Sequence, residues 1–123
     1  IKINIFTDKS LINKNFLKNA NNVSIYNKIS RDILSKTDCV MTDVFTSMND
    51  NFDQNKKNKL MHYQVNSEIM KYTNNQTVFM HCLPANIGEE VTEEVITSSK
   101  SIVLKQAYNR KVIQKGLISW LDI

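Results

Sequence analysis

A chain of 123 residues supports one domain with a modest core and is too short for two full lobes. Apolar residues make up 41% of it and charged residues 23%, a balance typical of a folded protein rather than a disordered one. The formal net charge of +4 comes from lysines scattered among asparagines, so a solvated lysine-rich face is favoured over nucleic-acid binding.

The beginning of the chain and its cysteines bear on the compartment. No apolar run approaches the roughly 18 residues that cross a bilayer, so we expect no membrane contact. The chain opens inside an apolar segment without an initiator Met, which suggests a fragment or a processed chain. Cys39 and Cys82 form no CxxC pair, so neither a disulfide framework nor a metal site is expected. A cytoplasmic location is predicted, and a mitochondrial or plastid one is left open because a transit peptide would lie upstream.

Short β-branched segments recur along the chain, each with a length typical of a strand. They cover residues 1–7, 23–26, 38–44, 77–83 and 101–104. Apolar residues at helical spacing fill the intervals, near residues 11–17, 29–34, 60–70 and 91–96. The polar stretch 49–58 interrupts this alternation and predicts a mobile surface loop.

The last segment has the clearest helical pattern. Its apolar residues fall at i, i+4, i+7 and i+8, and this stripe should pack against another surface. They are Ile113, Leu117, Trp120 and Leu121. Because strands alternate with helices along the chain, the sequence predicts the α/β class, with a parallel sheet covered by helices on both faces.

Three polar segments follow predicted strands. They are DVFTSM at residues 43–48, HCLP at 81–84, and AYNR at 107–110, which should open the last helix. In open α/β sheets, ligands bind beyond the carboxyl ends of the strands, where loops and helix N-termini converge. We therefore expect the three segments to share one crevice.

The candidate residues also have plain structural interpretations. Asp43 alone would be read as a cap after a strand, and Arg110 as a surface charge. Cys39, inside an apolar strand, is expected to be a core residue, and Cys82 alone would be read the same way. His81 and Cys82 are neighbours on an extended strand and face opposite sides, so a Cys–His nucleophilic pair is not expected.

The order of the motifs carries a family resemblance. DVFTSM, YQVN, FMHCLP with GEEVTEEV, and AYNR, in this order from about Asp38 to the end, resemble the C-terminal half of ornithine carbamoyltransferases. The resemblance implies that residues 1–123 are the ornithine-binding domain, a Rossmann-like three-layer αβα unit that is the incomplete C-terminal part of a two-domain enzyme. Cys82 favours an ornithine-type over an aspartate-type substrate.

The implied reaction is attack of the δ-amine of ornithine on the carbonyl of carbamoyl phosphate. It gives citrulline and phosphate without metal or organic cofactor, in arginine biosynthesis or in ornithine and citrulline metabolism. The complete enzyme is expected to form a homotrimer with active sites between subunits.

The resemblance also implies roles for particular residues. Substrate binding falls to four of them: Asp43 pairs with the α-ammonium of ornithine, Ser47 and Met48 fix the same end, and Leu83 offers a backbone carbonyl. Three are grouped as catalytic. Cys82 lies beside the reacting amine and orients or deprotonates it, Arg110 reaches the carbamoyl oxygen, and His81 belongs to the motif without a defined role.

Several features of the family are missing or altered. The Ser-Thr-Arg-Thr-Arg loop that binds carbamoyl phosphate is absent, so catalysis should be negligible without an N-terminal domain. Asn86 and Ile87 replace a usual His-Arg, and Tyr108 replaces a usual Glu. Two other hypotheses therefore stay open: a non-catalytic binding or regulatory domain, and a related transcarbamylase that uses putrescine or acylated ornithine.

Overall fold

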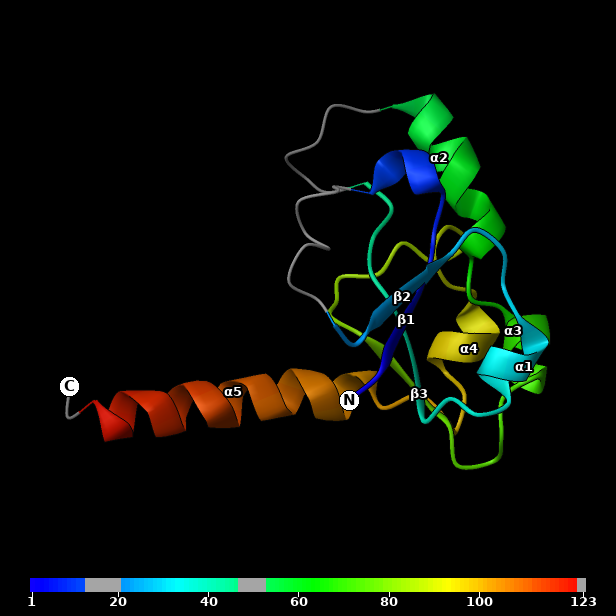
Figure 1. Ribbon diagram of the computed structural model, residues 1–123. Coiled ribbons are helices and arrows are strands. Elements are labelled where there is room, and N and C mark those ends of the chain that lie inside the picture. Colours follow the sequence, from blue (N-terminus) through cyan, green and yellow to red (C-terminus); the bar gives the residue numbers. More distant parts are fainter. Residues whose placement is uncertain (13–20, 47–52, 122–123) are drawn as a thin grey trace.

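The computed structural model describes residues 1–12, 21–46 and 53–121 (Figure 1). The strands are β1 (Ile3–Phe6), β2 (Val23–Tyr26), β3 (Cys39–Thr42) and β4 (Val78–His81). The α-helices are α1 (Arg31–Leu34), α2 (Gln54–Leu60), α3 (Ser67–Lys71), α4 (Glu93–Ile96) and α5 (Val103–Trp120). Two short 3-10 helices, η1 (Lys9–Leu11) and η3 (Met61–Tyr63), complete the described elements. None of the described helices combines the length and apolarity needed to cross a bilayer.

The described strands pair in parallel. β1 lies beside β2 and β3 beside β4, as two two-stranded sheets. In the second sheet Met41 is opposite Met80 and Thr42 is opposite His81. Parallel pairing with helices between the strands is the α/β class that the sequence predicted.

The core lies on one face of the β3–β4 sheet. Phe79 and Val91 are completely buried at its centre. Around them pack Val65, which precedes α3, Met70 of α3, Val95 of α4 and Val103 of α5. The opposite face of this sheet is open, and Met41 is 56% exposed there. Side chains alternate along a strand, so the core face is the one that carries Phe79 and His81.

Two boundary predictions are wrong. The expected strand 101–104 reduces to an isolated bridge between Ser101 and Phe79, because the chain turns into α5 at Val103 immediately afterwards. The expected loop 49–58 is helical from Gln54, because the Asp53 side chain accepts hydrogen bonds from the backbone N–H groups of Asn55 and Lys56. Residues 49–52 lie outside the described part of the chain.

Cys39 is exposed, which corrects the prediction that it belongs to the core. It lies on the open face of β3, the same face as Met41. An apolar strand does not specify which of its faces is covered, and here α5 lies beside Met80 of β4 on that side while Cys39 stays exposed.

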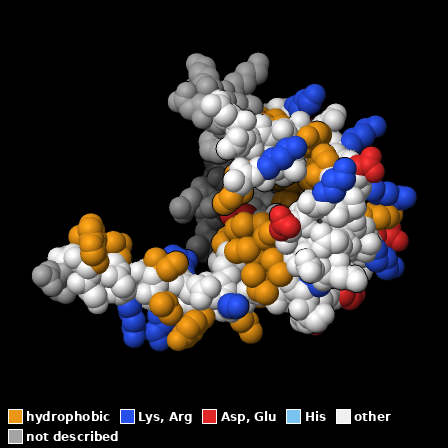
Figure 2. All heavy atoms as spheres, turned by 60° about the horizontal axis from the view of Figure 1, so that its bottom comes forward, with side chains coloured by type: hydrophobic (Ala, Val, Ile, Leu, Met, Phe, Trp, Pro, Cys, Tyr) orange, Lys and Arg blue, Asp and Glu red, His pale blue; other side chains and the backbone are white. Residues whose placement is uncertain are grey.

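Helix α5 begins beside β4 and then extends away from the body of the molecule (Figure 1). The AYNR segment lies inside this helix rather than at its start. In the predicted stripe, Ile113 is 70% and Trp120 79% exposed. Figure 2 shows hydrophobic side chains along the projecting helix, and Leu117 and Leu121 of the stripe are exposed as well.

Candidate active site

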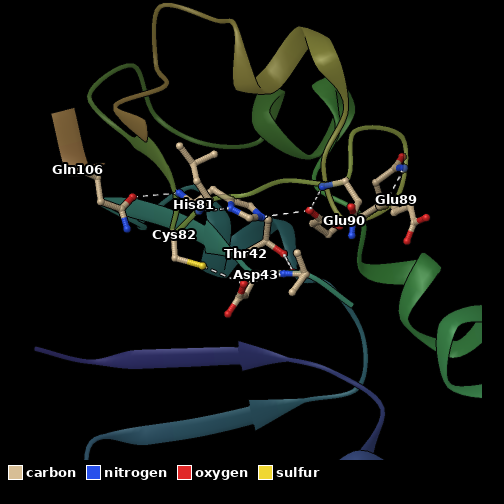
Figure 3. A network of polar contacts seen from close by, with 11 residues as sticks. Thr42, Asp43, His81, Cys82, Glu89, Glu90 and Gln106 are labelled. Carbon is tan, nitrogen blue, oxygen red and sulfur yellow. Dashed lines mark hydrogen bonds and ion pairs between the residues drawn. The ribbon is translucent and has the colours of Figure 1, made fainter. Parts of the chain in front are cut away.

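The site lies where β3 and β4 end side by side. The last residues of the two strands, Thr42 and His81, are register partners, so the residues that follow them meet at one edge. Those residues are Asp43 and Cys82, and the Cys82 thiol donates a hydrogen bond of 2.9 Å to Oδ1 of Asp43 (Figure 3). The predicted convergence of these two segments is therefore present.

The Asp43–Cys82 hydrogen bond shifts the pKa values of the two groups in opposite directions. The thiol holds the pKa of the Asp43 carboxyl below its ordinary value, helped by the backbone N–H of Val44, which donates to Oδ1 at 2.7 Å. The same bond to the carboxylate, with some burial, raises the pKa of the Cys82 thiol, and the charge of Arg110 opposes this rise. The thiol is therefore protonated near neutral pH, beside an ionised carboxylate.

The His81 ring occupies a different environment from the Cys82 thiol. It is buried, and its Nδ1 accepts a hydrogen bond of 2.9 Å from the backbone N–H of Leu83. Its Nε2 lies 3.1 Å from Oε1 of Glu90. Because Nδ1 accepts, the ring proton belongs on Nε2, which donates to Glu90. His81 and Cys82 do not share a proton, in agreement with the alternation argument.

Sequence reasoning missed two residues of this network. Glu90 is completely buried, and its Oε1 also accepts a hydrogen bond of 2.6 Å from the backbone N–H of Asn86. Gln106, on α5, accepts a hydrogen bond of 3.1 Å from the backbone N–H of His81. The GEEVTEEV segment was recognised as part of a motif, but the sequence does not distinguish the inward Glu90 from Glu89, which pairs with Lys57 at 2.6 Å.

The turn after Cys82 has an unusual backbone. Leu83 adopts φ = 55°, and its bond to Pro84 is cis. A leucine in this left-handed region costs on the order of 1 kcal/mol, so neighbouring contacts must hold it there. The hydrogen bond from Leu83 N–H to the His81 ring is such a contact.

Arg110 takes no part in the contact between Asp43 and Cys82. It is exposed on α5 and makes no hydrogen bond to Asp43 or Cys82 within the described chain. It lines a cavity of about 520 Å³ together with Met80 and Gln106. Met80 and Cys82 are two residues apart on an extended segment and share a face, so Arg110 lies on the thiol side. Ser47 and Met48, predicted to bind the amino acid, lie outside the described residues.

The structure also places the three residues named above that depart from the family pattern. Asn86 contributes its backbone N–H to Glu90, so its side chain is not what the network uses. Ile87 and Tyr108 are 55% and 64% exposed, and neither side chain is part of the core.

Comparison with known proteins places this arrangement in a family. The family model described as "Aspartate/ornithine carbamoyltransferase, Asp/Orn binding domain" matches residues 4–121. The ornithine carbamoyltransferase of Nitrobacter winogradskyi is 47% identical over 83 residues, which make up 68% of this chain and 27% of that protein. The chain therefore belongs to the aspartate/ornithine carbamoyltransferase family, and the resemblance inferred from its motifs is confirmed.

Solved structures agree on the fold. The crystal structure of ornithine carbamoyltransferase from Burkholderia thailandensis matches with a TM-score of 0.79 and 30% identity, over 98% of this chain and 38% of that one. N-acetyl-L-ornithine transcarbamylase matches with a TM-score of 0.73 over 98% of this chain and 40% of that one. At 21% identity the latter likeness shows the fold alone. The chain spans 27% of the length of curated ornithine carbamoyltransferases such as that of Nitrobacter winogradskyi.

Proposed function

We propose that this chain supplies the ornithine-binding half of an enzyme that transfers the carbamoyl group of carbamoyl phosphate to the δ-amine of ornithine. The contact between Asp43 and Cys82 at the shared end of β3 and β4 carries the proposal. It combines an ionised carboxylate with a protonated thiol at an edge where an α/β sheet binds ligands.

The ionised Asp43 suits an ammonium group. A charge-assisted hydrogen bond from the α-ammonium of ornithine to this exposed carboxylate would fix the amino-acid end of the substrate. Acylated ornithine has no free α-ammonium, so an anionic Asp43 favours free ornithine over it. Putrescine carries a second ammonium group but no α-carboxylate, so discrimination against it depends on recognition of that carboxylate and not on Asp43.

The chemical step joins the δ-nitrogen to the carbonyl carbon and breaks the carbon–oxygen bond to phosphate. The amine must attack as the neutral base and loses a proton on the way to citrulline, while phosphate leaves with its electron pair. Negative charge that develops on the carbonyl oxygen needs a cation or a hydrogen-bond donor. Arg110, on the thiol side of the site, is suited to that task, whereas the protonated Cys82 thiol is suited to orienting the amine.

This half cannot bind carbamoyl phosphate by itself. A phosphate dianion needs several N–H or cationic donors, and Arg110 alone does not provide them. The uncovered apolar surface of α5 and the open face of β3 suit an N-terminal carbamoyl-phosphate domain such as the resemblance implies. A homotrimer and a cytoplasmic location belong to the same proposal.

The test is citrulline formation by the protein encoded in the complete reading frame that contains residues 1–123. We expect turnover with ornithine and carbamoyl phosphate, and little or none with putrescine or N-acetylornithine. Asp43→Asn should raise the KM for ornithine strongly, because the neutral amide loses the charge-assisted contact. Asp38→Asn, which neutralises a carboxylate at the opposite end of β3, is the matched control and should not change this KM. Equal use of putrescine, or no carbamoyl transfer at all, contradicts the proposal.

A further inference from the structure

Two neighbouring carboxylates point in opposite directions beside the site. Glu89 is partly exposed and pairs with Lys57 of α2, at 2.6 Å. Glu90 is completely buried and directs Oε1 at the His81 ring (Figure 3). Nothing in the reaction described above uses Glu90.

The buried Glu90 is costly for the fold. Burying a carboxylate is unfavourable unless its oxygens are hydrogen-bonded, and Oε2 of Glu90 has no partner among the described residues. Replacing buried ionic groups with apolar ones is often neutral or stabilising. A group retained at such a site calls for a role beyond filling the core.

Glu90 fixes the orientation of the His81 ring. Its Oε1 accepts the hydrogen bond from Nε2, which leaves Nδ1 as the acceptor for the backbone N–H of Leu83. The ring therefore connects the buried carboxylate to the turn in which Leu83 has φ = 55°. Without the carboxylate, Nε2 would lose its acceptor, and the contact with Leu83 N–H would be the one hydrogen bond of the ring left within the described residues.

Cys82 is the residue between the two fixed points. On one side, the backbone N–H of His81 donates to Gln106 of α5, and on the other, the backbone N–H of Leu83 donates to the ring. These contacts set the direction in which the Cys82 side chain leaves the backbone. The thiol meets Oδ1 of Asp43 at 2.9 Å as a result.

We propose that Glu90 and His81 are positioning residues that hold the Leu83 turn and so place the Cys82 thiol against Asp43. The expected loss of kcat rests on the proposed carbamoyl transfer. The position of the Cys82 thiol does not depend on that reaction. Neither side chain touches the substrate: His81 acts through Leu83 N–H, and Glu90 acts through His81.

Two substitutions of His81 separate its two hydrogen bonds. In His81→Asn the amide oxygen can replace Nδ1 and accept from Leu83 N–H, whereas in His81→Gln the amide can replace Nε2 and reach Glu90. We expect His81→Gln to lower kcat by up to about 100-fold, the cost of misplacing a reacting group by about 1 Å. His81→Asn should lose much less, and the KM for carbamoyl phosphate should not change in either variant. Equal losses in the two variants would overturn the proposal.

The position of the thiol can also be followed without turnover. In a Cys39→Ser background, the rate of Cys82 alkylation by iodoacetamide is measured against pH in the protein from the complete reading frame. Glu90→Leu and His81→Gln should shift the profile to lower pH, because a thiol moved from Asp43 loses the contact that raises its pKa. Glu89→Leu is the matched control and should leave the profile in place. An unchanged profile in a folded Glu90→Leu protein contradicts the positioning role.

The two experiments separate this inference from the proposed function. If the wild-type protein forms no citrulline, the proposed reaction fails, while the alkylation profiles still decide the positioning role. If Glu90→Leu does not fold, the comparison of His81→Asn with His81→Gln in the same alkylation assay decides it. There the inference requires a profile closer to wild type for Asn than for Gln, and the same profile for both overturns it.

Discussion

The thiol of Cys82 donates its hydrogen bond to a carboxylate, Asp43, that lies 39 positions earlier in the chain. The two residues follow β3 and β4 at equivalent points of the register, which is how a long sequence separation becomes a direct contact. Because the acceptor is an anion, the bond favours the protonated thiol and the ionised carboxylate together. The pair thus carries one negative charge, located on Asp43.

This assignment makes thiol reactivity a measure of the contact. Asp43→Asn should shift the pH profile of Cys82 alkylation to lower pH, because a neutral amide no longer penalises the thiolate. The sign follows from the raised pKa of Cys82, which falls back toward its ordinary value when the adjacent anion is removed. The measurement is carried out in a Cys39→Ser background, since Cys39 is also exposed. Asp38→Asn, whose charge acts on Cys39 instead, should leave the Cys82 profile unchanged.

Turnover should distinguish orientation from proton removal by Cys82. If the protonated thiol orients the amine, Cys82→Ser keeps a donor for Asp43 and retains more activity than Cys82→Ala. We expect the serine variant to lie clearly above the alanine variant in kcat, with both below wild type. Steady-state citrulline assays at several pH values provide the comparison. Equal and severe losses would instead assign the proton transfer to the thiol.

The place of the site could be predicted from the sequence, but its supporting contacts could not. Asp43 and Cys82 each follow an apolar segment, and parallel strands bring such positions to one edge. The partner of His81 is different, because Glu89 and Glu90 are identical in type and adjacent in sequence. Only the path of the loop decides that one pairs with Lys57 and the other is buried.

Apolar character also failed to predict what covers a surface. Cys39 lies in an apolar strand and is nevertheless exposed, because α5 lies beside β4 on that face of the sheet and leaves Cys39 of β3 uncovered. The strand expected at 101–104 failed for a related reason. Val103 is buried as the first residue of a helix, and burial alone does not separate the two kinds of element.

The core around Phe79 should dominate the stability of the domain. This ring is completely buried between β4 and its neighbours, so Phe79→Ala removes a large apolar group and leaves a cavity. We expect a loss of about 3–5 kcal/mol in the free energy of unfolding, measured by urea denaturation. Met41→Ala, on the open face of the same sheet, should change this free energy by no more than about 0.5 kcal/mol. Similar losses for both would mean that the core lies elsewhere.

The ion pair between Lys57 and Glu89 should contribute little by comparison. Both side chains are partly exposed, so solvent screens their attraction although the Nζ–Oε1 distance is 2.6 Å. A double-mutant cycle with Lys57→Met and Glu89→Gln should give a coupling free energy of about 0.2–1 kcal/mol. The coupling should decrease when salt is raised, because screening acts on exposed charges. A coupling of several kcal/mol that is insensitive to salt would contradict the exposed geometry.

Helix α5 offers an optical test of whether a further part of the protein covers it. Trp120 is the only tryptophan of the chain and is 79% exposed near the end of α5. In a polypeptide of residues 1–123 its fluorescence should be red-shifted and readily quenched by acrylamide. In the protein from the complete reading frame, with any other tryptophan replaced by phenylalanine, the emission should shift to the blue and quenching should weaken. That change follows if the apolar side chains around the helix are buried by a second domain, since a helix that is apolar on several faces needs more than one neighbouring surface. Identical quenching in the two proteins would show that α5 stays uncovered, and the proposed N-terminal domain would then have to contact this chain elsewhere.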